Sequence, residues 1–291
     1  MIISSALRRI GRCFDYFGFS IWINIKNLLG SEVNFNLIVG VMSMSELLLA
    51  QALTKTFQSK TALHELNLSV HRSEIVCLLG ANGAGKTTTI NLFLGFLEPT
   101  SGAAYVDGIE VSNNLDTARA KISYVPEQVS LYPSLTGLEN LDYFVKLSGK
   151  KQPDESYLRE LLDQVGLDQI AADNKVKSYS KGMRQKVGLA ISLAKDAKAL
   201  LLDEPLSGLD PSAANEFSNL LRKLANNGTA VLMATHDLFR AKEISDRIGI
   251  MKSGSLVREL SPERLDQASL EEIYLEQMRN SSSAGGYADE S

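Results

Sequence analysis

The sequence contains few cysteines, no excess of basic residues and no long apolar run, and each absence excludes a class of protein. Its two cysteines, Cys13 and Cys77, are too few for a disulfide framework or a four-ligand zinc site, which favours a reducing compartment. The formal net charge of −4 argues against nucleic-acid binding, because such proteins usually carry a basic surface. No apolar run approaches the roughly 18 residues that a transmembrane helix needs, so no ordinary membrane span is predicted.

The composition is that of an ordinary folded protein. Of the 291 residues, 44% are hydrophobic and 22% are charged, which excludes collagen, coiled coil and wholesale disorder. The length allows one large domain or two modest ones.

The two ends of the chain differ from the rest. Residues 1–43 contain four basic and two acidic residues and the single tryptophan, Trp22. They are interpreted either as an interfacial amphipathic segment or as residues upstream of a natural start at Met42 or Met44. The second interpretation is favoured, because a strand pattern begins directly after Met44. Residues 279–291 are rich in Ser, Gly and acidic residues and are predicted to be a disordered tail.

Between these ends, strand and helix patterns alternate, which predicts an α/β fold. Strands are expected at 66–70 and 74–79, and Val106, Asp107 and Gly108 indicate a hairpin turn. The short apolar runs 200–202 and 230–234 are typical of buried parallel strands.

A mostly helical stretch from about 115 to 185 interrupts this alternation. Thr136 followed by Glu139 predicts a capping box at a helix start. The apolar residues between 158 and 165 have helical spacing, and Gly166 is predicted to end that helix. A helical subdomain inserted into an α/β core is therefore expected.

The segment 80–87 is the most specific motif in the chain. It fits the pattern G-x-x-x-x-G-K-[ST], with a strand predicted before it and a helix after it. Glycines allow backbone N–H groups to converge on phosphate oxygens, and the following helix directs its positive end at the anion. Lys86 is expected to reach the β- and γ-phosphates and the Thr87 hydroxyl to bind Mg²⁺. The segment predicts a nucleotide site.

A second group of candidate residues follows two buried strands. Asp203 ends the first strand and suits a magnesium ligand, while the adjacent Glu204 suits a base for an attacking water. His236 follows the second strand and is placed to contact a γ-phosphate or that water. Because ligands of α/β sheets bind at the carboxyl ends of strands, these side chains are expected to meet the phosphate loop.

The segment Tyr179–Gln185 resembles the signature loop of ATP-binding-cassette (ABC) ATPases, usually Leu-Ser-Gly-Gly-Gln. Ser180 and Gly182 match, whereas Tyr179, Lys181 and Met183 depart from the consensus. The variant Ser-Lys-Gly-Met-Arg-Gln resembles ATPase subunits of bacterial multidrug, sodium and copper exporters, as does the closing helix 270–275.

Other motifs of this family follow in order. Phe57 stands where an aromatic residue stacks on adenine, residues 207–210 resemble the D-loop, and His236 resembles the switch histidine. Residues 124–128 resemble the Q-loop region, but Glu127 stands where Gln is usual and Gln128 follows it. Either side chain is a candidate for the Q-loop role.

The resemblance covers about residues 46–278 and implies a P-loop NTPase fold with a mixed sheet, an N-terminal antiparallel β part and an inserted helical subdomain, in one ABC ATPase domain at 44–278. It implies that Glu204, His236 and Lys86 are catalytic. Mg²⁺ would be held by Thr87, Asp203 and either Glu127 or Gln128. The residues expected to bind ATP are Phe57, Gly80, Ala81, Asn82, Gly83, Ala84, Gly85, Lys86, Thr87, Thr88, Glu127, Gln128, Ser180, Gly182 and Asp210.

The family also implies partners. Two such chains, identical or different, would sandwich ATP and drive a separate integral-membrane permease. They would work at the cytoplasmic face of the bacterial inner membrane, with no nucleic acid involved. An exporter is favoured over the alternative of a soluble ABC ATPase without a transport role. The transported substrate is not encoded in these motifs.

Overall fold

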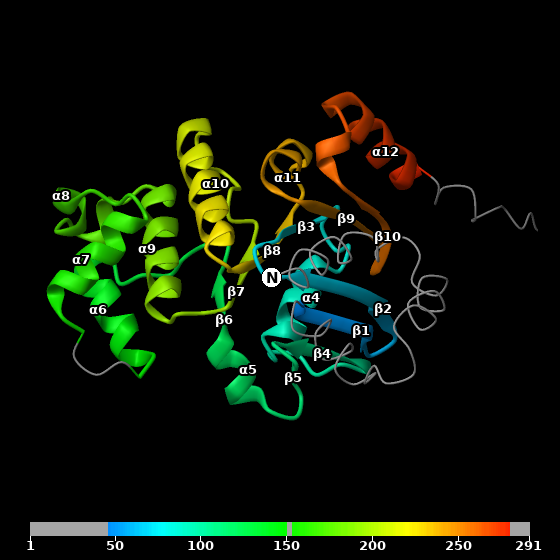
Figure 1. Cartoon of the computed structure of the whole chain (residues 1–291), viewed down its shortest axis with the longest axis horizontal. Helices are drawn as coiled ribbons and strands as arrows, with labels where there is room; N and C mark the ends of the chain where they lie inside the picture. The colour runs from blue at the N-terminus through cyan, green and yellow to red at the C-terminus, as the bar shows by residue number, and fades with distance from the viewer. Residues whose placement is uncertain (1–45, 150–152, 280–291) are drawn as a thin grey trace, which may run out of the picture. The chain divides into compact units, whose positions relative to one another are not determined.

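The computed structural model describes residues 46–149 and 153–279 (Figure 1). The interpretations of residues 1–43 lie outside the described residues. So does the predicted tail, except for Arg279, which is the last residue of helix α12.

A six-stranded sheet forms the centre of the described chain. Its strand order is β10-β9-β3-β8-β7-β6. The neighbours from β9 to β6 pair in parallel, and β10 pairs antiparallel with β9 at one edge, so the predicted mixed sheet is confirmed. The strands are β3 (Ile75–Leu79), β6 (Ile122–Val125), β7 (Ala199–Asp203), β8 (Ala230–Thr235), β9 (Arg247–Lys252) and β10 (Ser255–Leu260).

Alternate residues of the central strands enter two different hydrophobic cores. In β3, Ile75, Cys77 and Leu79 face one core, whereas Val76 and Leu78 face the other. All five are buried, which is why the strand reads as a continuous apolar run in the sequence.

An antiparallel sheet of four strands, in the order β2-β1-β4-β5, packs over the second core. This confirms the predicted antiparallel β part. Asp107 and Gly108 join β4 to β5 with φ values of 50° and 75°, as a tight hairpin turn requires. Helix α4 (Lys86–Phe93) contacts strands of both sheets. The strands are β1 (Glu46–Phe57), β2 (Lys60–His71), β4 (Ser101–Val106) and β5 (Ile109–Glu110).

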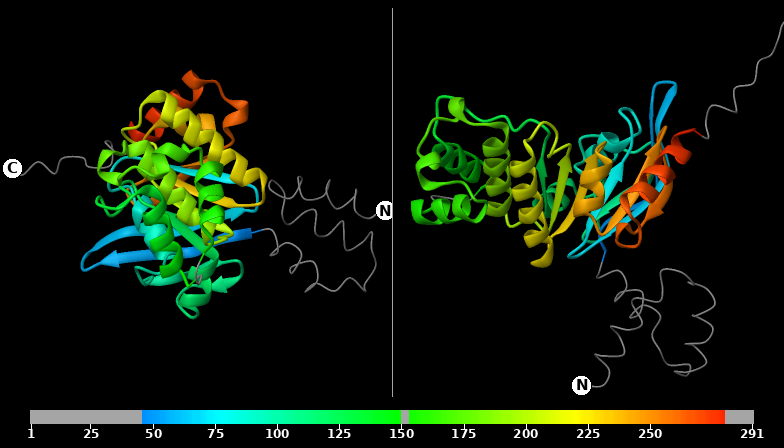
Figure 2. Two further views of the ribbon diagram at one scale, coloured as in Figure 1. Left: turned by 90° about the vertical axis from the view of Figure 1, so that its left-hand side faces the viewer. Right: turned by 90° about the horizontal axis from the view of Figure 1, so that it is seen from above.

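The helical subdomain lies beyond β6, at the opposite edge of the central sheet from β10 (Figure 2). The expected start near residue 115 is too early, because β6 falls inside that stretch and pairs with β7. Four residues in β6 are too few for a clear alternating pattern, and only the pairing identifies them as a strand. The elements of the helical subdomain are α6 (Gly137–Leu147), α7 (Glu155–Gln164), α8 (Gln169–Ala172), η1 (Val176–Ser178) and α9 (Lys181–Ala194). Helix α5 (Leu115–Lys121) precedes β6 and contacts β4, β5 and β6 instead.

The remaining helices pack on the first core. They are α10 (Pro211–Asn226), α11 (Leu238–Ile244), η2 (Pro262–Arg264) and α12 (Gln267–Arg279). Within 46–149 and 153–279, every helix is too short or too polar to cross a membrane. Burial raises the pKa of the Cys77 thiol to about 12, which leaves this side chain protonated and unreactive.

The capping box predicted at Thr136 is present. The Thr136 hydroxyl accepts a hydrogen bond from the Glu139 amide at 3.1 Å, and the Glu139 carboxylate accepts one from the Thr136 amide at 2.7 Å. These bonds satisfy N–H groups that have no partner inside α6.

We expect Thr136→Ala to lower the free energy of unfolding by about 1 kcal/mol, because the cap of α6 is lost. Thr117→Ala is the matched control, since Thr117 is exposed within α5 and alanine favours the helix there. Urea denaturation of both variants measures the difference. Equal stabilities of the two would contradict a capping role for Thr136.

Candidate functional site

The phosphate loop connects the end of β3 to the start of α4, as the sequence predicts. Gly85 is the N-cap of α4 with φ of 104°, and Gly83 has φ of 81°, conformations that favour glycine. No side chain caps the helix, so its first N–H groups are available to an anion.

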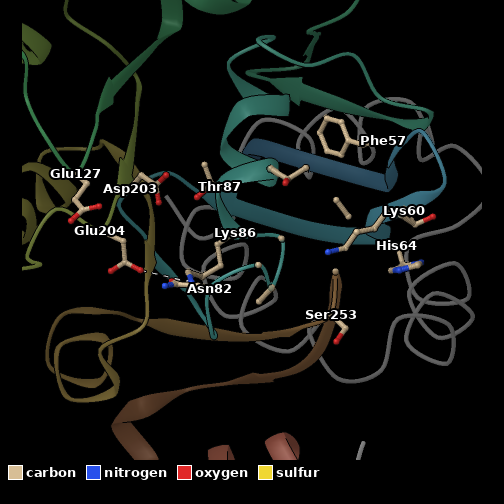
Figure 3. A pocket seen from close by; sticks show the side chains of 17 residues that line it. Phe57, Lys60, His64, Asn82, Lys86, Thr87, Glu127, Asp203, Glu204 and Ser253 are labelled. Atoms are coloured by element: carbon tan, nitrogen blue, oxygen red, sulfur yellow. Dashed lines mark ion pairs between the residues drawn. The ribbon is translucent and has the colours of Figure 1, made fainter. Parts of the chain in front are cut away.

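A cavity of about 770 Å³ opens over this loop (Figure 3). Residues 82–88 of the loop, with Glu127, Asp203 and Glu204, line one part of it. Phe57, residues 60–62, His64, Ser253 and Gly254 line the remainder. The structure thus brings Phe57, most of the phosphate loop and three of the four acidic candidates around one space.

Lys86 is held inside the loop by main-chain oxygens. Its ammonium donates to the carbonyl of Gly80 at 2.6 Å and to that of Ala81 at 3.2 Å, and lies 3.8 Å from Oε1 of Glu204. The residue is only 5% exposed. Gly80 and Ala81 therefore position the lysine that the cavity presents to a ligand.

Asp203 and Thr87 form the part of the cavity that fits a magnesium ion. Burial raises the pKa of the Asp203 carboxyl, and a hydrogen bond with the Thr87 side chain acts in the opposite direction. A cation beside this carboxylate would offset the burial penalty, and both groups offer the hard oxygens that Mg²⁺ prefers. In the described ranges no three His, Cys, Asp or Glu side chains cluster as a metal site.

Glu204 and His236 lie together because β7 and β8 end side by side. Nδ1 of His236 is 2.9 Å from Oε1 of Glu204, although the pair is not aligned as a hydrogen bond. Glu204 has φ of 47°, a left-handed conformation that is uncommon outside glycine, and its amide donates to the carbonyl of Ala234. Its side chain is 14% exposed, against 58% for His236. The carboxylate is largely shielded from water while the imidazole is open to it.

The two candidates for the Q-loop role differ in position. Both side chains are exposed, but Glu127 lines the cavity and Gln128 does not. The geometry therefore favours Glu127 for a role near the phosphates.

The far part of the cavity includes residues that the motifs do not reveal. Phe57 is 43% exposed, as a stacking platform requires, and Lys55 lies over its ring at 5.2 Å. Lys60 and His64 line the same region from β2. Only their position just after Phe57, across the β1–β2 hairpin, would have indicated them.

The turn at Ser253–Gly254 supports the phosphate loop from outside the loop itself. Gly254 donates to the carbonyl of Ala84 at 3.0 Å and accepts from the amide of His64 at 2.8 Å. Gly254 has φ of 82°, and a Cβ there would lie 2.8 Å from the carbonyl oxygen of Ala62. This turn carries no recognisable motif, which is why the sequence does not predict its role.

Ser180, Gly182 and Asp210 do not line the cavity of their own chain. The Ser180 hydroxyl caps α9 by accepting from Met183 at 3.2 Å, and Asp210 caps α10 by accepting from Ala213 at 3.0 Å. A Cβ on Gly182 would lie 3.3 Å from Cβ of Ala213, so the two helix starts are close together.

The phosphate loop, Asp203 and the parallel sheet define the class of protein, a P-loop nucleoside triphosphatase. The family model described as ABC transporter matches residues 63–207. The ABC transporter ATP-binding protein YdbJ of Bacillus subtilis is 39% identical over 220 residues, which cover 75% of this chain and 70% of YdbJ. The bacitracin transport ATP-binding protein BcrA of Enterococcus faecalis is 36% identical over 223 residues, covering 76% and 71%.

A solved structure agrees with these relatives. A dimeric ATP-binding cassette in a post-hydrolysis state with bound ADP and Pi superposes with a TM-score of 0.67 and 29% identity. The match covers 74% of this chain and 98% of that cassette. The chain belongs to the ABC transporter ATP-binding family and is an ATPase of that family.

We expect Gly254→Ala to weaken ATP binding about tenfold or more. The new Cβ would collide with the carbonyl oxygen of Ala62 and push strand β2 away from the phosphate loop. Gly228→Ala is the matched control. Gly228 has φ of 102° but no atom within 4 Å of a new Cβ, so only backbone strain is added. Fluorescent ATP-analogue titration distinguishes the two. Equal affinities would show that the turn does not support the loop.

Proposed function

We propose that the chain is the ATP-hydrolysing subunit of an exporter and that it works as an ATP-dependent dimer on a separate membrane permease. The name of BcrA, a bacitracin transport protein, supports a transport role for this chain. The Ser-Lys-Gly-Met variant of the signature loop supports export. The location that follows is peripheral, at the cytoplasmic face of the membrane that holds the permease.

The observation that carries the dimer is the position of Ser180. This residue starts a helix of 14 residues, yet Ser180 and Gly182 lie outside the ATP cavity of their own chain. In the proposed dimer the positive end of this helix meets the γ-phosphate held by the other chain. ATP then joins the two chains, and its hydrolysis removes the bridging charge.

In the proposed reaction Glu204 accepts a proton from the water that attacks the γ-phosphorus. Its low exposure and its restrained backbone fix the carboxylate, and His236 and Glu127 orient the water and the γ-phosphate. Lys86 exchanges its carbonyl partners for phosphate oxygens and stabilises the charge that develops. Mg²⁺, held by Thr87 and Asp203, would neutralise charge on the phosphates.

The permease is proposed to contact the helical subdomain near the start of α6. Tyr132 and Tyr143 are 46% and 42% exposed and pack edge to face with centroids 5.0 Å apart. With Leu131 and Leu135 nearby in the sequence, they offer an apolar surface on the helical subdomain.

We expect Glu204→Gln to bind ATP and to form an ATP-stabilised dimer, while hydrolysis falls by about 10²–10⁴-fold because the amide cannot accept the proton. Phosphate release and size-exclusion chromatography with ATP and Mg²⁺ measure these two properties. Glu98→Gln, at an exposed position away from the cavity, is the control. Near-normal turnover would contradict the role of Glu204 as base, and a monomer at saturating ATP would contradict the dimer.

A further inference from the structure

Lys181, the first residue of α9, makes an ion pair with a residue that lines the ATP cavity of its own chain. Its ammonium lies 3.5 Å from Oε1 of Glu127, and the two side chains are 30% and 48% exposed. Both positions are departures from the usual ABC motifs, with Lys in place of Gly and Glu in place of Gln. The chain thus carries two opposite charges where neutral residues are usual, and the fold places them together.

The same ammonium also lies against the loop that follows Glu204. It is 3.8 Å from the point that a Cβ on Gly208 would occupy. Lys181 therefore stands between the loop after β6, which carries Glu127, and the loop after β7, which carries the proposed base.

The backbone of Glu127 is fixed independently of this ion pair. Gln185, one helical turn after Lys181, is fully buried, and its amide donates to the carbonyls of Pro126 at 3.2 Å and Glu127 at 2.9 Å. Residues four apart share one face of a helix, so Gln185 and Lys181 both face the loop after β6. Gln185 fixes the main chain, which leaves Lys181 to determine where the Glu127 carboxylate lies.

The ion pair between Lys181 and Glu127 compensates negative charge at the cavity. Glu127, Asp203 and Glu204 line one side of the cavity, and the negative charge of Glu127 acts on Asp203. Lys86 lies 3.8 Å from Glu204, whereas the ion pair of Glu127 is made with Lys181. An unpaired Glu127 would be free to turn away from the cavity into solvent, because water solvates a carboxylate well.

We propose that Lys181 is a positioning residue for ATP hydrolysis that holds the Glu127 carboxylate at the cavity within the same chain. The proposal rests on the proposed role of Glu127 beside the γ-phosphate. Because the pair is partly exposed, its contribution to folding stability is small, and its effect is expected on turnover.

The test is a double-mutant cycle on the purified full chain. We expect Lys181→Ala to lower kcat about tenfold or more with the KM for ATP changed less than about threefold, since ATP still binds but Glu127 is misplaced. Lys181→Arg keeps the charge and restores most of the activity. Lys177→Ala removes another exposed lysine close by and is the control.

The cycle separates action through Glu127 from any other action of Lys181. In the background of Glu127→Gln, adding Lys181→Ala is expected to change kcat less than about twofold, because there is no carboxylate left to position. Unchanged kcat in Lys181→Ala, or effects that multiply in the double variant, would overturn the proposal. Multiplying effects would instead indicate that Lys181 acts on the nucleotide of a second chain.

A second measurement, of ATP-dependent dimer formation, tests the role of Lys181 separately from the proposed dimeric function. Lys181→Ala combined with Glu204→Gln is expected to form the same ATP-dependent dimer as Glu204→Gln alone. A dimer lost only in the combined variant would assign Lys181 to dimer formation and overturn the positioning role. If Glu204→Gln itself fails to dimerise, the dimeric function fails, while the cycle on turnover still decides the role of Lys181.

Discussion

The site depends on the register of three parallel strands. Leu79 of β3 is paired with Thr235 of β8, and Asp203 of β7 is paired with Ala234. One residue further, the Gly80 amide donates to the carbonyl of Thr235 and the Glu204 amide to that of Ala234. These main-chain bonds place the phosphate loop, the acidic pair and the residue after β8 at one edge. A shift of one residue in either pairing would turn the carboxylates into the hydrophobic cores.

The parts of this arrangement that the sequence predicts are those with local physical causes. A glycine-rich turn, a capping serine or threonine and a buried apolar strand each act within a few residues, so their patterns are visible in the chain. The phosphate loop, the caps at Thr136 and Ser180 and the strands β7 and β8 were all predictable for this reason. The mixed sheet, in contrast, was implied by the resemblance to ABC ATPases, because no local pattern indicates that β10 pairs antiparallel with β9.

The parts that the sequence does not predict depend on contacts between distant segments. Gly254 lies 170 positions after Ala84 and contacts the phosphate loop through one main-chain hydrogen bond to it. Because no side chain takes part in that bond, the residue types do not indicate it. The choice between Glu127 and Gln128 depends on which side chain the loop after β6 turns toward the cavity, a detail of backbone direction. Strand β6 is recognisable only by its partner β7. Tertiary pairing, not residue preference, decides each of these.

Helix α9 combines a feature that local sequence predicts, its N-cap, with contacts to a distant segment that the sequence does not predict. Its N-cap Ser180 is exposed and lies outside the cavity of its own chain. Lys181 and, one turn later, Gln185 contact Glu127 in the loop after β6. In the proposed dimer, a γ-phosphate from the other chain that draws in the start of α9 would move Lys181 with it, because both residues belong to one rigid turn. The Glu127 carboxylate would follow its partner, so the arrival of the second chain and the arrangement of the first chain's cavity become one event. A neutral pair at these positions would transmit that movement only through the buried amide of Gln185, which contacts the main chain and not the carboxylate. In the proposed dimer, the paired charges would therefore connect dimer formation to the hydrolytic site in a way that the backbone contacts alone would not.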